Sequence, residues 1–360
     1  MLAKIKNLIF YLLIVFVVIN ILLAIVWPII TDFRVKSKTF YSDEILKLIG
    51  ISSSEQADFY KEMWINRKYE YIQFVGQHEK TKNNQKYLNV DLENGRKIKN
   101  NKLCEKNFFF YGASHTFGYN VKDEQTISSQ FKVILEKKFK NYCVYNFGSG
   151  SFFSTQETIF FMTHLLKNKI KKKDFIFFLD GLTEAGNKKT KFNTITGSSL
   201  EYSNLKYWEK YYYSIPLFWK SLPVVQLYNR YLQKNRLKNL NTEVKIKDKK
   251  KETFDVFQKN TLIRKAICLE LEINCYTFLQ PFPTMSGIYD SNKTSKISYS
   301  EYTTQREKYE SFKEIKHLID LSKVLEEMEE LSYVDDWHYS PKASNIIATK
   351  IYSVISKDLE

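Results

Sequence analysis

Two stretches far apart in the chain carry residue types that can together perform nucleophilic catalysis. Ser114 lies within GASHTFG at 112–118, directly after the apolar run 107–111. Asp335 and His338 lie in one short stretch, DDWH at 335–338. A carboxylate can there accept a hydrogen bond from one ring nitrogen while the other ring nitrogen faces a serine hydroxyl. Because such a pair gives Ser114 a base and steadies the resulting imidazolium, we expect a catalytic triad.

Two further turns follow apolar runs and carry groups that can bind a developing oxyanion. Gly148 lies in NFGSG at 146–150, and its N–H is not shielded by a side chain. Thr183 lies in DGLTE at 180–184. Each turn by itself is typical of an ordinary structural turn. The serine segment is not a lipase-type elbow, because Thr116 stands where G-x-S-x-G needs glycine, and no Gly-Lys-Ser/Thr follows it as in a Walker loop.

Apolar runs that alternate with helical stretches predict how these turns are positioned. We expect three buried strands, at 107–111, 142–147 and 175–180. Helices are expected between them, at 126–139 and 155–167. This order predicts right-handed crossovers and a parallel sheet with helices on its faces. Ligands of such sheets bind at the carboxyl ends of the strands, where the candidate residues lie.

The pattern resumes in the last third of the chain. We expect a strand at 274–279 between two helices, at 252–271 and 305–329. A last helix is expected after Pro341, since proline fits the first turn of a helix. The Tyr- and Lys-rich region at about 200–251 is interpreted as an insertion that covers the edge or mouth of the sheet.

In this order the motifs resemble those of the SGNH (GDSL-like) hydrolases. That family carries a nucleophilic serine, an oxyanion glycine, an oxyanion asparagine and a late D-x-x-H. The first block matches at Gly112, Ser114 and Gly118, and the second matches at Gly148. Ala113 stands where the founding motif has Asp, a change also frequent among membrane-anchored relatives.

The last block matches fully at Asp335 and His338, whereas the third departs from the family pattern. Thr183 stands where the family has its asparagine, so a hydroxyl replaces the amide donor, or Asn187 reaches in from the next turn. Loss of one oxyanion donor costs about a hundred- to a thousand-fold in turnover. Two other segments are similar to anchored bacterial relatives: Asn89-Val90-Asp91 with Gly95-Arg96, and Gln280-Pro281.

The resemblance implies a flavodoxin-like, three-layer α/β/α fold with a parallel sheet. It also implies acyl transfer through a covalent acyl-serine, with neither a metal nor a cofactor. Ser114 would attack, His338 would act as base and then acid, and Asp335 would orient His338. The N–H groups of Ser114 and Gly148, with Thr183, would hold the oxyanion.

An almost unbroken apolar run, Leu8 to Ile30, precedes all of these motifs and is long enough to span a bilayer. We expect an uncleaved anchor rather than a signal peptide, because the run is long and no small-x-small cleavage site follows it. Flanking basic residues are balanced and do not orient the helix. The resemblance implies a single-pass protein of the inner membrane with its catalytic domain in the periplasm.

The domains expected are therefore a cytoplasmic tip and anchor at 1–32, a membrane-proximal segment at 33–100 and the SGNH-like domain at 101–360. In the membrane-proximal segment, Ser42 and Ser54 are expected to cap short helices, and Asn94-Gly95 is a turn signal.

Composition bears on compartment and partners. Cys143 and Cys268 sit in apolar patterns, so we expect buried thiols rather than a disulfide framework. The net charge of +15 does not indicate nucleic-acid binding, because the lysines are scattered and the densest run, at 245–251, lacks interleaved aromatics. We interpret that run as a solvated loop, with attraction to anionic lipid or acidic glycan as the functional alternative.

Three functions remain open from the sequence. The leading hypothesis is a serine esterase that removes acetyl or another small acyl group from a cell-envelope glycan. The second is an O-acyltransferase that passes the acyl group to a sugar of a surface polysaccharide or peptidoglycan. The third is a non-catalytic, glycan-binding envelope protein in which Thr183 marks a decayed site.

Overall fold

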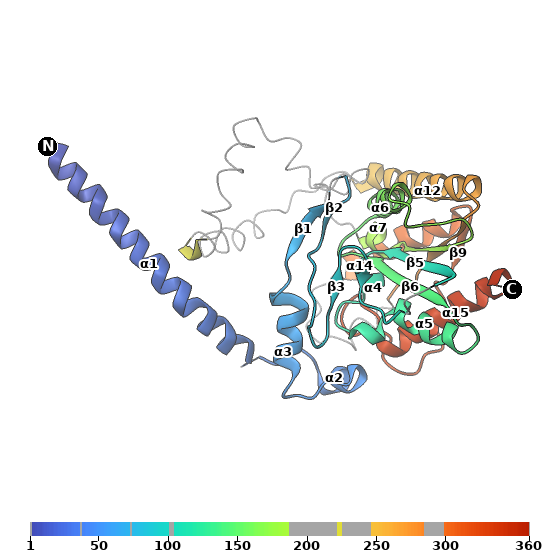
Figure 1. Ribbon diagram of the computed structural model, residues 1–360, viewed down its shortest axis with the longest axis horizontal. Coiled ribbons are helices and arrows are strands. Elements are labelled where there is room, and N and C mark those ends of the chain that lie inside the picture. Colours follow the sequence, from blue (N-terminus) through green and yellow to red (C-terminus); the bar gives the residue numbers. More distant parts are fainter. Residues whose placement is uncertain are drawn as a thin grey trace. The chain divides into compact units, whose positions relative to one another are not determined.

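A computed structural model describes residues 2–36, 38–72, 74–100, 104–186, 222–224, 246–283 and 299–359 (Figure 1). The chain divides into two compact units. One comprises 1–39 and 199–246, and the other comprises 40–198 and 247–360. Asn187 and most of the expected insertion at 200–251 lie outside the described residues.

The second unit is built on a seven-stranded sheet with the order β3-β4-β6-β5-β7-β8-β9. Its parallel strands are β5 (Lys106–Gly112), β6 (Tyr142–Gly148), β7 (Phe175–Asp180), β8 (Asn274–Leu279) and β9 (Leu318–Asp320). Their order follows the flavodoxin-like pattern 2-1-3-4-5. A short antiparallel hairpin, β3 (Val90–Asp91) and β4 (Gly95–Arg96), extends the sheet beside β6. The predicted α/β fold with a mainly parallel sheet is therefore confirmed.

Helices cover both faces of this sheet because its strands are apolar on both sides. Phe108 and Phe110 pack in a core with α5 (Ile127–Glu136) and α15 (Pro341–Leu359). On the opposite face, Phe109 and Tyr111 pack against α6 (Ser154–Leu166) and Cys268 of α12 (Ile246–Glu270). In Figure 1 the two pairs of helices lie on opposite sides of β5 and β6. Successive side chains of a strand point to opposite faces, so this pattern produces three layers.

The segment before the main sheet folds onto it. The segment contains α2 (Asp43–Ile49), α3 (Gln56–Tyr60), a π-helix (Lys61–Ile65), β1 (Tyr69–Ile72) and β2 (Gly76–Glu79). Its buried side chains form one cluster with Phe117, Tyr119 and Val334. The part of the expected segment 33–100 that follows residue 39 thus belongs to the same compact unit as the sheet.

One of the two expected caps is present. Ser42 caps α2, and its hydroxyl accepts a hydrogen bond from the N–H of Ile45 at 3.3 Å. The expected cap at Ser54 is wrong, because α3 begins after Glu55, which makes no side-chain cap bond. The hydroxyl of Ser54 instead lies 3.0 Å from that of Ser52, and Ser52 also donates to Glu55. Local side-chain bonds here replace the helix cap.

The expected helix at 305–329 is also wrong in its second half. α14 ends at Ser311, a short 3-10 turn covers Phe312–Glu314, and β9 follows. Leu318 and Ile319 pair with Thr277 and Phe278 of β8, so the chain returns to the sheet as an edge strand. A strand of three residues is too short for its periodicity to be distinguished from the last turn of a helix.

All four cysteines form disulfides, which corrects the expectation of buried thiols. Cys104 pairs with Cys143 of β6, with Cα atoms 5.6 Å apart. Cys268 of α12 pairs with Cys275 of β8, with Cα atoms 6.0 Å apart. The sequence spacing gave no sign of either bond, because each one joins residues that only the fold brings together. Disulfides persist mainly in oxidising compartments.

The other unit contains α1 (Leu2–Lys36). Ile5–Ile30 of this helix is long and apolar enough to cross a membrane, and 6% of its most apolar window is buried. The amide of Asn20, the strongly polar interruption, donates to the carbonyl of Phe16 at 2.8 Å, so its side chain is partly satisfied within the helix. The described helix fits either a membrane anchor or a signal sequence.

The Cys104–Cys143 disulfide closes a loop of 39 residues, so we expect it to contribute about 2 to 4 kcal/mol to the free energy of unfolding. The double variant Cys104→Ser, Cys143→Ser should lower the midpoint of urea unfolding accordingly. The variant Cys268→Ser, Cys275→Ser, whose bond closes only a seven-residue separation, should lose less. Equal losses in the two variants would contradict the loop-closure account.

A buried histidine gives the fold a dependence on pH. Burial, followed by the charges of Lys169 and Lys167, lowers the pKa of His164 to about 3. The ring lies 2.6 Å from the hydroxyl of Tyr111. An unfolded histidine has a pKa of about 6.5, so below that pH the unfolded chain binds the proton first and stability falls.

We expect His164 to cost about 2 kcal/mol of stability between about pH 7 and about pH 5, from a slope of about 1.4 kcal/mol per pH unit. Urea unfolding over that range measures the slope. His164→Gln removes the titration, so its slope should be shallower by about one proton whatever its absolute stability. Identical slopes in both proteins would show that His164 is not the group responsible.

Candidate active site

The carboxyl ends of β5, β6 and β7 meet at one edge of the sheet. Gly112 pairs with Gly148 of β6 and with Leu179 of β7. The turn that carries Ser114 therefore lies at the same level as the two turns proposed for the oxyanion. The strand order reverses around β5, which is where ligands bind in open α/β sheets.

Ser114 is the first residue of the short helix α4 (Ser114–Phe117), which begins directly after β5. A Cβ atom on Gly148 would lie 2.3 Å from the N atom of Phe117, so only glycine lets α4 approach the end of β6. The amide of Asn146 donates to the carbonyl of Thr116 at 2.8 Å. Strand β6 thus fixes the helix that carries Ser114, whose side chain stays partly exposed.

Asp335 and His338 are brought together as predicted. His338 Nδ1 lies 2.7 Å from Asp335 Oδ2. Asp335 Oδ1 accepts hydrogen bonds from the backbone N–H groups of Trp337 and His338, both at 2.8 Å. Burial raises the pKa of Asp335, but the charge of His338 and these hydrogen bonds outweigh burial and lower it to about 2. Asp335 is therefore a carboxylate at any ordinary pH.

The second ring nitrogen of His338 is available for chemistry. Within the described residues, Nε2 is buried and has no hydrogen-bond partner, so no hydrogen bond joins it to Ser114 Oγ. The ring of His115, the residue after Ser114, has its centroid 5.4 Å from that of His338. The structure therefore places His338 beside the serine turn, and such bonds tighten when substrate binds.

Asn120 is a site residue that the sequence did not reveal. Its amide donates to Asp335 Oδ2, the same oxygen that contacts His338. Its carbonyl oxygen accepts from Trp64 Nε1 at 2.6 Å and from the Tyr41 hydroxyl at 2.8 Å. Asn120 has φ of +60°, a conformation that asparagine tolerates better than most residues. The segment before the sheet is thus linked through Asn120 to the carboxylate of Asp335.

Arg96 holds the loop that presents Asn120. Its guanidinium donates to the carbonyls of Phe117 and Val121, at 2.7 and 2.6 Å, and also to that of Gly118. Its Nε bonds to Asp123 at 2.9 Å. Arg96 is buried, and these hydrogen bonds compensate for the loss of water around its guanidinium charge. The Gly95-Arg96 pair noted in the sequence therefore supports the site from outside it.

Gln280-Pro281, the other segment noted in the sequence, supports the histidine loop. The hydroxyl of Tyr339 donates to the carbonyl of Pro281 at 2.8 Å. The hydroxyl of Tyr309 donates to the carbonyl of Gln280 at 2.7 Å. The end of β8 thereby fixes the residue that directly follows His338.

The residues expected to bind the oxyanion differ in their hydrogen bonding and in whether they lie within the described residues. The N–H of Gly148 donates to Asn146 Oδ1 at 3.0 Å, so it is already engaged at the end of β6. Thr183 lies half-buried in α7 (Leu182–Gly186), directly after β7. Asn187 lies outside the described residues. Oxyanion roles for Gly148 and Thr183 stay predictions, and the N–H of Ser114, at the start of α4, is a third candidate.

A buried charged network fixes the turn that carries Thr183. The carboxylate of Glu184 accepts from the N–H groups of Ser154 and Gly181, at 2.7 and 3.0 Å. Arg264 of α12 pairs with Asp180 and donates to the carbonyl of Ser154 at 2.5 Å. Burial, and then the charge of Asp180, raises the pKa of Glu184 to about 7. The network joins the end of β7 to the starts of α6 and α7.

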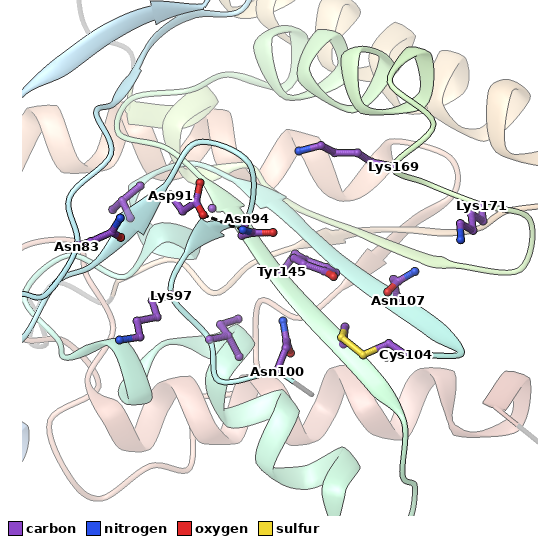
Figure 2. Close-up of a pocket in the computed structure, with 14 residues that line it drawn as sticks. Asn83, Asp91, Asn94, Lys97, Asn100, Cys104, Asn107, Tyr145, Lys169 and Lys171 are labelled. Atoms are coloured by element: carbon purple, nitrogen blue, oxygen red, sulfur yellow. Dashed lines mark hydrogen bonds between the residues drawn. A yellow bond between two sulfur atoms is a disulfide. The ribbon is translucent and has the colours of Figure 1, made fainter. Parts of the chain in front are cut away.

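A separate hollow of about 710 Å³ lies against the outer strands β3, β4 and β6 (Figure 2). Asp91 and Asn94, joined by a hydrogen bond of 2.7 Å, line it together with Tyr145. The described residues that line it include no member of the triad. Among the described residues, no group of three or more His, Cys, Asp or Glu side chains is placed to hold a metal ion.

We expect Asn120→Ala to lower kcat about ten- to a hundred-fold, because the variant removes a donor from Asp335 Oδ2 and leaves the Trp64 and Tyr41 donors without their acceptor. Steady-state kinetics on an aryl acetate measures the change. Asn345→Ala, which removes an exposed amide bonded to Gln130, is the matched control. An unchanged kcat for Asn120→Ala would show that Asp335 needs no such support.

No protein-family model matches the sequence, and no curated protein matches it. Solved structures that resemble it include a member of the lipolytic G-D-S-L family from Veillonella parvula, at 10% identity and a TM-score of 0.39, covering 70% of this chain and 98% of that one. A lipase/acylhydrolase from Enterococcus faecalis has 11% identity and a TM-score of 0.38, covering 70% and 96%. An acetyl xylan esterase, AlAXEase, has 12% identity and a TM-score of 0.33, covering 69% and 99%. The chain is similar to SGNH-like (GDSL-like) proteins, and its chemistry follows from its own residues.

Proposed function

We propose that this protein is a serine-dependent acyl ester hydrolase with Ser114 as nucleophile. The observation that carries the proposal is the Asp335–His338 pair, 2.7 Å apart. The Nε2 of His338 has no hydrogen-bond partner among the described residues, and its ring centre lies 5.4 Å from that of His115, the residue after Ser114. A buried imidazole nitrogen without a partner is costly unless a group that binds there repays it. The hydroxyl of Ser114 in an ester complex is such a group.

The reaction proceeds in two halves. His338 Nε2 takes the proton of Ser114 as Oγ attacks the ester carbonyl, and Asp335 stabilises the imidazolium. The tetrahedral intermediate collapses as His338 returns the proton to the departing alcohol, which leaves an acyl-serine. Water then attacks in the same way, and the acid departs. The N–H of Ser114, with Gly148 or Thr183, holds the oxyanion.

The substrate class is proposed from the protein's surroundings. The apolar helix α1 would confine the enzyme to a membrane surface. Two disulfides favour an oxidising compartment, and hence a periplasmic or other extracytoplasmic catalytic unit. The net charge of +15 favours acidic polymers over neutral ones. We therefore propose an acyl group on a cell-envelope glycan, acetyl being the simplest, as the substrate.

Transfer of the acyl group to a sugar hydroxyl would use the same residues. The burial of His338 Nε2 favours this alternative, because a base shielded from bulk water can select an acceptor that binds next to it. Aryl acetate turnover with and without glycan separates the two. Release that requires glycan and yields acetylated sugar would identify a transferase, whereas release at the same rate in both conditions would identify a hydrolase.

We expect Ser114→Ala to abolish labelling by a fluorophosphonate probe and to lower kcat on an aryl acetate about ten-thousand-fold or more. Labelling requires an activated hydroxyl, so in-gel fluorescence of the intact protein reads out the triad directly. Ser353→Ala, an exposed serine on α15, should label as the wild type does. If the wild-type protein is folded but neither labels nor turns over an ester, the non-catalytic glycan-binding alternative is favoured.

A further inference from the structure

The hairpin of β1 and β2 carries exposed aromatic rings on one face. Tyr69 and Tyr71 are 46% and 74% exposed, whereas Glu70 and Ile72, which alternate with them in β1, are less exposed. Residues two apart in a strand point to the same face, about 6.6 Å apart along the chain. The hairpin is a separate two-stranded sheet, visible beside the main sheet in Figure 1. Two exposed rings on one face offer a flat surface on which another ring can pack.

A series of neighbouring side chains connects Tyr69 to His338. The guanidinium of Arg67 lies 4.9 Å from the ring centre of Tyr69 and 5.2 Å from that of Trp64. The ring centre of Trp64 lies 6.4 Å from that of His338. Tyr119, also stacked on Arg67, has its ring centre 5.5 Å from that of His338. Tyr69 is therefore the outer end of a track of side chains that begins at the candidate catalytic base, and Tyr71 lies two residues further along the same face of the strand.

The track is held in a fixed conformation by buried partners. Glu79 Oε1 accepts from Arg67 Nε and from the Tyr119 hydroxyl, each at 2.7 Å. Glu79 is buried in β2, so it neutralises Arg67 and fixes it between the rings. A Cβ atom on Gly150 would lie 2.7 Å from the Tyr119 hydroxyl, so glycine lets the turn after β6 close against the track. Preorganised rings bind with little loss of conformational freedom.

We propose that Tyr69 and Tyr71 form a subsite for the sugar rings that flank the acylated residue of a glycan. The proposal rests on the proposed function, since it supplies a binding site for that substrate. Sugar rings present C–H faces that pack on aromatic rings, and tyrosine adds a hydroxyl for hydrogen bonding. The cation of the track is already paired with Glu79, so this subsite recognises the faces of the sugar rings, and the acidic groups of the proposed polymer are left to the basic surface outside it.

The test uses the full chain in detergent with two substrates. One is an aryl acetate, which has no sugar ring, and the other is an O-acetylated cello-oligosaccharide. We expect Tyr71→Ala and Tyr69→Ala to lower the ratio of kcat/KM for the oligosaccharide to kcat/KM for the aryl acetate, by about ten-fold in the double variant. Phe74→Ala removes an equally exposed ring at the hairpin turn and should leave the ratio unchanged. A ratio that is unchanged in the double variant overturns the subsite.

A binding arm separates failure of the subsite from failure of the proposed function. Titration calorimetry with the deacetylated oligosaccharide needs no catalysis, and Ser114→Ala should bind it as the wild type does. Weaker binding by the tyrosine variants supports the subsite even if no ester is hydrolysed. Normal ester turnover with binding indifferent to both tyrosines overturns the subsite alone. Oligosaccharide binding that is weakened as much by Phe74→Ala as by Tyr71→Ala would show that the effect does not come from the face of the two tyrosines, and also overturns the subsite.

Discussion

The carboxylate of Asp335 is the group on which the rest of the site depends. A buried charge is costly unless it is hydrogen-bonded, and here two backbone N–H groups, the His338 ring and the Asn120 amide all point at it. These donors keep it ionised with a pKa of about 2. The ionised carboxylate favours the His338 tautomer with the proton on Nδ1, 2.7 Å from Asp335 Oδ2, which leaves Nε2 able to accept a proton. A serine placed beside Nε2 then needs no other activation.

Keeping the buried carboxylate of Asp335 ionised requires hydrogen-bond partners, and several of these come from segments outside the parallel strands. Asn120 can donate to Asp335 only because Trp64 and Tyr41 occupy its carbonyl oxygen and Arg96 shapes its loop. Trp64 comes from the π-helix, Tyr41 comes from the turn just before α2, and Arg96 comes from the β3–β4 hairpin. The part of the expected membrane-proximal segment that follows residue 39 therefore helps to position Asp335 and His338. Its aromatic residues also lead outward to the exposed hairpin.

The sequence predicted features whose pattern is local, and it missed features that depend on contacts between residues far apart in the chain. Strands such as Phe175–Asp180 are apolar on both faces, and the glycines at their ends mark the turns, so the sheet and the place of Ser114 could be predicted. Asp335 and His338 are close in sequence, so their pairing is local. Asn120 meets Asp335 across 215 residues, and Cys104 meets Cys143 only when β6 is in place. Such contacts have no local periodicity or spacing, and β9 was missed because three residues carry too little pattern.

The surroundings of two groups of carboxyls at this edge of the sheet give them different protonation states. Asp335 is surrounded by donors and stays charged, whereas burial raises the pKa of Glu157 and Glu184 behind β7. Arg264 is the cation within reach of both Glu157 and Asp180, so one positive charge serves several acids and a proton is retained among them. A network of that kind resists movement, because shifting any member leaves another buried polar group without a partner. The turn that carries Thr183 is thus fixed by a buried cluster in which burial raises the pKa of two carboxyls, whereas the carboxylate proposed to assist His338 is kept ionised by its own hydrogen-bond donors.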